Sequence, residues 1–494
     1  MTGTHLLPDM KRINTLVFLL LLTAAAFAGI QPASPFTDHM VLQRNALVPI
    51  WGMASPGEKI TVTLANQKMS TVAAADGKWM VKLGKLKAGG PFSLIIKGTN
   101  TITLTDVYVG EVWLCSGQSN MDMTVAREDR SWCGVYNEAQ ELAAANYPMI
   151  RVFDADFVPS EEIKDTVGGK WEVCSPATVG HFSAAAYFFA RELYNKYKVP
   201  IGLLTTAYGA STVEAWTSKK TLQANPLFAR LLNDYTKRKA TFDTSQTGKT
   251  KDPRRDQHSP YVLYNGMVAP LIPYAIKGAL WYQGESNIPS KDIYDLLMEA
   301  MVRNWREDWA QGNFPFIYVQ LANYGKASDS MPGKGGGTTE IRDKQRRNLS
   351  IPNTAMVVAI DNADKPSNIH PKNKQAIGLR LALAAEALVY GEKIPYSGPV
   401  FNKMQIEGHS IRLQFTHTDG GLVSKKEMPA GFAIAGADKK FVWAHATIEG
   451  DAVVVSSAEV PNPVAVRYAW GDNPVISLYN KADLPASPFR TDEW

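Results

Sequence analysis

The sequence predicts an α/β domain with a mostly parallel sheet, flanked by antiparallel β regions at both ends of the chain. Three observations favour this class. Short alternating strands fill residues 30–105, apolar runs interleave with helices over 106–395, and alternation returns over 396–494. Strands buried on both faces of a parallel sheet are apolar throughout, whereas half-buried antiparallel strands alternate. A length of 494 residues agrees with these three regions, at roughly 150 residues per domain.

The first 28 residues are typical of a secretory signal peptide. Lys11 and Arg12 precede the apolar run INTLVFLLLLTAAAFA, which closes in the small-x-small sequence of residues 26–28. An uncleaved membrane anchor is the alternative, but the run is shorter than the ~20 residues that a span needs. The first cysteine is Cys115, so a lipid-modified N-terminal cysteine is not expected. We therefore expect a periplasmic or secreted protein with no membrane span after cleavage.

The two flanking regions carry the period-two pattern of half-buried strands. In the N-terminal region, KITVTL alternates Ile60, Val62 and Leu64, and DGKWMVKL begins at an Asp-Gly turn. In the C-terminal region, SIRLQF, DAVVVSS and PVAVRYAW repeat the pattern. Each region is therefore predicted to be an antiparallel β unit.

The middle region alternates buried strands with helices. The strand candidates are EVWLC, IGLLTTAY, GALWYQ, FIYVQL and AMVVAI. FSAAAYFFARELYNKYK has a wide apolar face, and NKQAIGLRLALAAEALVYG ends at Gly391, a typical helix stop. Two polar, Gly/Pro/Lys-rich segments, 242–260 and 325–339, are predicted to be loops that could flank a site.

Composition excludes several classes of protein. The formal charge of +5 is small for this length and the chain has no long basic run, so a nucleic-acid partner is not expected. Three cysteines do not make a disulfide scaffold, although Cys133 and Cys174 could pair; Cys115, in an apolar strand, is expected to be a buried thiol. Without a histidine cluster they do not make a metal site either.

Polar side chains follow four of the predicted strands, at the edge where open α/β sheets bind ligands. Gly-Gln-Ser-Asn follows the first strand at 117–120, and Gly-Ala-Ser-Thr follows the second at 209–212. Gln-Gly-Glu-Ser-Asn follows the third at 283–287, and the stretch after AMVVAI ends in Asn-Ile-His-Pro, with His370. A hydroxyl, a glycine turn, an amide and an imidazole are the groups that acyl transfer requires.

The roles follow from this chemistry. A serine hydroxyl needs a base, so we assign Ser119 as nucleophile and His370 as base, the only one of eight histidines at such a strand end. The backbone N–H groups of Ser119 and Gly209 and the side-chain amide of Gln283 are candidate oxyanion donors. Asn120 is expected to brace the nucleophile turn, and Glu285 to be a partly buried structural carboxylate. The competing interpretation of Ser119 alone is a turn serine that caps a helix.

Four blocks, GEVWLCSGQSNM, YGASTVEAW, GALWYQGESN and IHPKNKQAIGLRLA, resemble those of the SGNH/GDSL hydrolases, in the branch of sialate O-acetylesterases and related carbohydrate acetylesterases. The early FTDHMVLQRNALVPIWGMASPGEKITV and the C-terminal tail are also similar, so the resemblance covers nearly the whole chain. It implies a three-layer sandwich, a catalytic Ser119, a base at His370, and an oxyanion hole from Ser119, Gly209 and Gln283.

Two positions depart from that pattern. Members often carry Gly-Gly in the second block, where this chain has Gly209 followed by Ala210. Many members carry Asp two or three residues before the histidine, where this chain has Ser367 and Asn368. The group that orients the imidazole is thus open: Asp364 is the tentative choice, with Asp361, Asn368 or a backbone carbonyl as alternatives, the last two making a Ser-His dyad.

Three functions remain open. The resemblance favours an exported serine esterase that removes O-acetyl groups from sialic acid. The alternatives are an esterase for an acetylated polysaccharide such as xylan, and a catalytically inert carbohydrate-binding protein. No cofactor or metal is implied, and the oligomeric state is not predicted. Trp216 and Tyr282 could face a sugar and Arg342 a substrate carboxylate, but the two aromatics could equally belong to the core and Arg342 to the surface.

Overall fold

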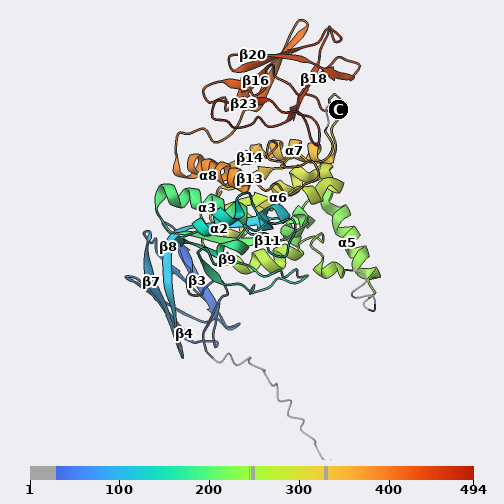
Figure 1. Cartoon of the computed structure of the whole chain (residues 1–494). Coiled ribbons are helices and arrows are strands. Elements are labelled where there is room, and N and C mark those ends of the chain that lie inside the picture. Colours follow the sequence, from blue (N-terminus) through green and yellow to red (C-terminus); the bar gives the residue numbers. More distant parts are fainter. Residues whose placement is uncertain (1–28, 244, 246–250, 328–331) are drawn as a thin grey trace, which may run out of the picture.

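The computed structural model describes residues 29–243, 245, 251–327 and 332–494. The expected signal peptide, residues 1–28, lies outside the described residues. Figure 1 shows the N-terminal strands (blue) at one end of the molecule and the C-terminal strands (red) at the other, with the helical region between them. No helix in the described ranges is long and apolar enough to cross a membrane.

The central sheet has the order β10-β9-β11-β8-β12-β13-β14. All neighbouring pairs are parallel except β9 and β10, which are antiparallel at one edge. The predicted α/β class with a mostly parallel sheet is therefore confirmed. The strands are β8 (Thr101–Gly117), β9 (Tyr147–Asp154), β10 (Trp171–Cys174), β11 (Ile201–Ala207), β12 (Gly278–Tyr282), β13 (Phe316–Gln320) and β14 (Thr354–Val358).

Helices cover both faces of this sheet. Trp113 of β8 packs against Phe189 of α3, whereas Trp281 of β12 packs against Trp305 of α6. Trp281 is in register with Ser116, three residues along β8 from Trp113, so the two tryptophans point to opposite faces. The helices are α1 (Ser119–Asp122), α2 (Glu138–Ala144), α3 (Ala184–Tyr197), α4 (Lys219–Gln223), α5 (Ala229–Thr241), α6 (Tyr294–Trp309), α7 (Gly337–Arg347) and α8 (Lys374–Tyr390).

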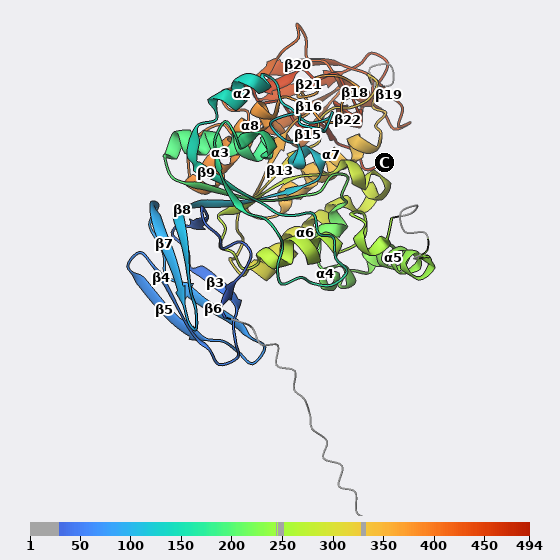
Figure 2. The ribbon, with the colours of Figure 1, turned by 60° about the horizontal axis from the view of Figure 1, so that its bottom comes forward.

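The N-terminal β region is not separated from the central sheet. Strand β8 pairs with β7 at its start, where Leu104 lies opposite Leu94, and with β11 at its end, where Cys115 lies opposite Thr205. The expected boundary between residues 105 and 106 therefore falls inside one strand, as the view in Figure 2 also shows. The other strands are β1 (Gln31–Pro32), β2 (Val41–Gln43), β3 (Val48–Met53), β4 (Lys59–Leu64), β5 (Gln67–Val72), β6 (Lys78–Leu83) and β7 (Gly89–Lys97).

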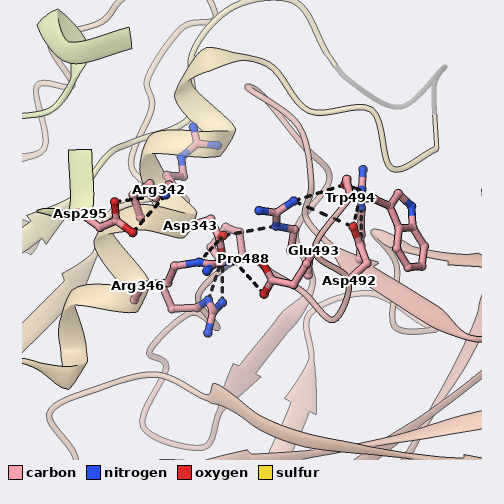
Figure 3. A network of polar contacts seen from close by, with 12 residues as sticks. Asp295, Arg342, Asp343, Arg346, Pro488, Asp492, Glu493 and Trp494 are labelled. Carbon is pink, nitrogen blue, oxygen red and sulfur yellow. Dashed lines mark hydrogen bonds and ion pairs between the residues drawn. The ribbon is translucent and has the colours of Figure 1, made fainter. Parts of the chain in front are cut away.

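The C-terminal β region docks on α7 through charged side chains (Figure 3). Asp343 of α7 pairs with Arg346 and Arg347 of its own helix and with Arg490 of the tail. The strands, all paired antiparallel, are β15 (Val400–Glu407), β16 (Ser410–Thr416), β17 (Leu422–Ser424), β18 (Phe432–Ala435), β19 (Phe441–Trp443), β20 (His445–Glu449), β21 (Ala452–Ser456), β22 (Ala465–Tyr468), β23 (Leu478–Asn480) and β24 (Phe489–Arg490).

The cysteines are all buried free thiols within the part of the chain that the structure describes. Cys115 is a buried thiol as expected, and burial raises its pKa well above the usual range. Cys133 and Cys174, the possible pair, are not bonded to each other.

Candidate active site

The nucleophile turn depends on a glycine at the end of β8. Gly117 has φ +143°, and a Cβ built there would lie 2.2 Å from the carbonyl oxygen of Tyr282 on the neighbouring strand. Only glycine allows this close approach. The chain then turns at once into α1, which begins at Ser119. The turn therefore presents Ser119 at the carboxyl edge of the sheet, beside β12 and β11.

The structure brings Ser119 and His370 together from positions 251 residues apart. Ser119 Oγ lies 2.8 Å from His370 Nε2. Burial, and then the charge of Lys374, lower the pKa of His370 to about 4. The imidazole is therefore neutral at pH 7 and free to accept the serine proton. Trp132 packs against the ring, with 4.8 Å between centroids.

The predicted contact between Asp364 and the imidazole is not what the structure has. Both Asp364 carboxylate oxygens accept from the amide of Asn368, at 2.9 and 3.1 Å. Asn368 in turn accepts from the backbone N–H of His370 at 3.0 Å and donates to its carbonyl at 2.8 Å. Asp361 is paired with Arg380 at 2.7 Å. Asn368 thus stands between Asp364 and His370. Asp364 binds the side chain of Asn368, and Asn368 in turn binds the backbone of His370 and not its ring.

The second nitrogen of the imidazole, Nδ1, has no acceptor in hydrogen-bond geometry among the described residues. The arrangement is therefore a Ser-His dyad whose loop is held by Asn368 and Asp364.

Two of the three predicted oxyanion donors lie beside the nucleophile. A Cβ built on Gly209 would lie 3.9 Å from the Ser119 Cβ, and Tyr208 N–H donates to Gly117 O at 3.0 Å, which ties the two turns together. Ser119 is the first residue of α1, so its N–H has no acceptor within that helix. For Gly209 N–H, no acceptor is found in the described ranges. Both groups are therefore open to a developing negative charge.

The side chain of Gln283 does not serve as the third donor in this structure. Its amide nitrogen donates to Ser211 O at 3.1 Å and to Asn287 Oδ1 at 2.6 Å, and its oxygen accepts from the Tyr294 hydroxyl at 3.2 Å. Because the amide has only two hydrogens and both are engaged, none is left for a substrate. Gln283 instead ties the end of β12 to the turn after β11.

A network of buried polar side chains lies behind the dyad. Asn120 donates to Glu285 Oε1 at 2.8 Å and to the carbonyl of Ile369 at 3.1 Å. Its side-chain oxygen accepts from Lys374 Nζ at 2.8 Å. Asn120 therefore braces the nucleophile turn against the histidine loop. Lys374 was not singled out in the sequence, and its position in the fourth block, four residues after His370, was the only signal that pointed to it.

A cavity of about 300 Å³ lies on the β9 side of the nucleophile. Its lining includes Asp122 of α1, Asp154 at the end of β9, and the exposed Phe157. Arg130 pairs with Asp122 at 3.0 Å and its guanidinium lies 5.0 Å from the Trp132 ring. Burial raises the pKa of Asp122 to about 6. Carboxylates, a guanidinium and an aromatic ring are groups that bind sugar hydroxyls and sugar faces.

A larger hollow of about 820 Å³ begins on the other side of Phe157. The Phe157 ring lies 5.0 Å from that of Tyr208, the residue before Gly209. Arg254 and Arg255, from the predicted loop 242–260, also line it. Part of that loop and part of 325–339 lie outside the described residues.

Three side chains considered for sugar or carboxylate contacts are instead core residues. Trp216, Tyr282 and Arg342 are completely buried. Arg342 donates to the carbonyls of Leu321, Ala322, Gly471 and Asp472, which joins the catalytic region to the C-terminal strands.

Comparisons with known proteins find a matching family model, full-length relatives and a similar solved structure. Residues 109–246 and 255–388 match the family model described as carbohydrate esterase, sialic acid-specific acetylesterase. The human sialate O-acetylesterase is 34% identical, covering 96% of this chain and 95% of its own; the mouse enzyme is 32% identical, covering 96% of each. The crystal structure of a carbohydrate acetylesterase from Xanthomonas citri is 36% identical with a TM-score of 0.83, covering 94% of this chain and 100% of its own.

Proposed function

Because the chain belongs to the sialic acid-specific acetylesterase family of carbohydrate esterases, we propose that it is an exported serine esterase that removes O-acetyl groups from sialic acid. The contact between Ser119 Oγ and His370 Nε2 carries this proposal, since it pairs a hydroxyl with a neutral imidazole. The same contact argues against an inert carbohydrate-binding protein, which would have no need of it.

The reaction follows from the positions of these groups. Ser119 Oγ attacks the acetyl carbonyl while His370 Nε2 takes the hydroxyl proton. The tetrahedral oxyanion accepts hydrogen bonds from the N–H groups of Ser119 and Gly209. The C–O bond to the sugar breaks, and the sugar oxygen takes the proton from His370, leaving an acetyl-Ser119 ester. Water, deprotonated by His370, then attacks this ester; the bond to Ser119 Oγ breaks, Oγ takes the proton back from His370, and acetate leaves.

The choice of sugar rests on two observations that point in different directions. Full-length relatives that are 34% identical are sialate O-acetylesterases, which favours sialic acid. The cavity beside α1 carries Asp122, Glu128 and Asp154 against the single guanidinium of Arg130. An excess of carboxylates suits a neutral, hydroxyl-rich sugar, so acetylated xylan is the second candidate.

One experiment tests the proposal and chooses the sugar. Acetate release is measured for the wild type and Ser119→Ala on O-acetylated sialic acid and on acetylated xylan. Ser119→Ala should lose activity by about 10⁴-fold or more, by analogy with other serine hydrolases. Ser367→Ala is the matched control, because Ser367 is exposed on the histidine loop. Activity on one ester names the substrate, and no release from either ester by a folded wild type would contradict the proposal.

Export is tested separately. Expression of the full chain in a Gram-negative host should yield a mature protein that begins just after Ala28, in the periplasm or the medium. A mature chain that retains residues 1–28 would contradict export by signal cleavage.

A further inference from the structure

Lys374 is a buried cation in direct contact with the groups that support the dyad. It is the first residue of α8 and is completely buried. Its ammonium donates to Asn120 Oδ1 at 2.8 Å and to the carbonyl of Pro371 at 2.7 Å, and it lies 5.5 Å from the centre of the Tyr282 ring. Burying a charged lysine costs free energy unless the ammonium is paired and hydrogen-bonded. The position of Lys374 therefore directs attention to the groups that it binds.

The contacts of Lys374 span the elements that carry the reaction. Asn120 follows the nucleophile, Pro371 follows the base, and Glu285 stands at the end of β12. Asn120 links them, because it also donates to Glu285 Oε1 and to the carbonyl of Ile369, the residue before His370. The backbone on both sides of His370 is therefore bonded, directly or through Asn120, to one buried ammonium group.

We propose that Lys374, acting through Asn120 and Glu285, is the positioning residue that holds His370 against Ser119, in the place of an aspartate on the imidazole. The proposal rests on the esterase function proposed above. It accounts for two features together: the absence of an acceptor at His370 Nδ1 in the described part of the chain, and a lysine buried where no substrate can reach it.

The charge of Lys374 affects the pKa of His370, and this effect can be measured. The groups that face it electrostatically are Glu285, Asp364 and Cys133, besides His370 itself. Burial lowers the pKa of Lys374 to about 7, with Glu285 acting in the opposite direction. Lys374 is therefore charged where His370 titrates, near pH 4, and its charge lowers the pKa of His370. Removing that charge must raise the His370 pKa.

Above pH 7 the amine of Lys374 is neutral but still has two hydrogens to donate. Its bonds to Asn120 and Pro371 survive, while its repulsion of the imidazolium formed during catalysis disappears. Wild-type kcat should therefore rise again as pH increases through about 7, and this second rise should vanish when Lys374 is replaced.

The test compares Lys374→Met with Lys372→Met, the same replacement two residues away, where the described structure shows no polar partner for the side chain. We expect kcat to fall about 100-fold in Lys374→Met, as for a misplaced catalytic group, with KM changed less than about twofold. By NMR titration, the His370 pKa should rise by about one unit. Lys374→Gln, which keeps a hydrogen-bond donor, is measured if the methionine variant does not fold; it should raise the pKa similarly but lose less kcat.

A second readout needs no sugar and separates this proposal from the proposed function. A fluorophosphonate ester labels an activated serine, and mass spectrometry gives the rate of labelling at Ser119. The rate should fall about 100-fold in Lys374→Met and not in Lys372→Met. Equal labelling rates and equal His370 pKa values in the two variants would overturn the positioning role. A wild type that labels rapidly but releases no acetate from either sugar ester would overturn the substrate instead.

Discussion

Two shielded carboxylates, one at the junction with the C-terminal strands and one behind the Ser119–His370 pair, have pKa values shifted in opposite directions. Asp343 stands where α7 meets the C-terminal tail, and its side chain is 2% exposed. Burial raises its pKa, but Arg346, Arg347 and their neighbours outweigh this and lower the pKa overall. Glu285 stands behind the Ser119–His370 pair; the residue is only partly buried, but one of its carboxylate oxygens is shielded from solvent. Its pKa is raised by burial, which the hydrogen bond from Asn120 only partly offsets.

The two carboxylates differ in their hydrogen-bond and ion-pair partners. Asp343 has guanidinium groups from three arginines, whereas one oxygen of Glu285 has no hydrogen-bond partner within the described residues. The carboxylate at the junction thus has direct ion pairs, whereas Glu285 has none among the described residues and meets the charge of Lys374 only at longer range. Perturbed groups of this kind are typical of functional sites, where charge is placed for the reaction rather than for stability.

The largest effect is expected at the junction. Asp343→Ala leaves the surrounding guanidinium groups without their carboxylate, so the free energy of unfolding should fall by about 3–5 kcal/mol. Because the folded-state pKa is lowered, the contribution is complete above the unfolded value of about 3.9 and disappears as pH falls through the folded value. Chemical unfolding at pH 7 measures the loss.

A matched control lies on the same helix. Glu340 of α7 forms a more exposed pair with Lys291, so Glu340→Ala should cost less than about 1 kcal/mol. The kcat of folded Asp343→Ala should equal that of the wild type. Equal stabilities of the two variants would mean that the junction gains nothing from its buried carboxylate.

A smaller effect on the free energy of unfolding is expected at Glu285, with a pH dependence opposite to that of Asp343. A carboxyl whose folded-state pKa is raised makes the protein less stable as pH rises from about 4.3 towards that folded value. Glu285→Gln cannot titrate and keeps an acceptor for Asn120. Its unfolding free energy relative to wild type should therefore increase between pH 4 and pH 8. For Asp343→Asn the difference from wild type should be constant over that range and should shrink only below about pH 3.9, where the wild type loses the contribution of the carboxylate. The same pH dependence in both variants would remove the contrast between the two sites.

Local patterns in the sequence were sufficient for the main features of the fold and for the proximity of Ser119 and His370. Apolar runs mark β8, β11, β12, β13 and β14, because strands buried on both faces must be apolar. Ser119 and His370 could be found because parallel strands end at one edge, where polar residues after a buried strand meet. Strands β9 and β10 were not among the strand candidates: β9 carries Arg151, and β10 is only four residues long at the edge of the sheet.

The partners of these residues could not be found in this way. Gln283 and Asp364 are correctly near the site, but hydrogen-bond partners depend on side-chain directions that the sequence does not contain. Asn368 donates hydrogen bonds to Asp364, and the amide of Gln283 donates to Ser211 and Asn287. Lys374 is the clearest case, since a lysine at the start of a helix is ordinarily exposed and only the packing of α8 buries it.

The smallest expected effect concerns backbone strain at the catalytic edge. Ala210, where relatives of this type often carry glycine, has φ +58°, a left-handed conformation that costs a residue with a Cβ about 1–2 kcal/mol. Glycine relieves this strain but increases the entropy of the unfolded chain, so Ala210→Gly should raise the free energy of unfolding by about 0.5–1 kcal/mol. Ala224→Gly is the control, because Ala224 is exposed with φ −70° and should lose about as much. Chemical unfolding at pH 7 gives both values. If both variants lose the same amount of stability, the left-handed conformation of Ala210 carries no measurable strain.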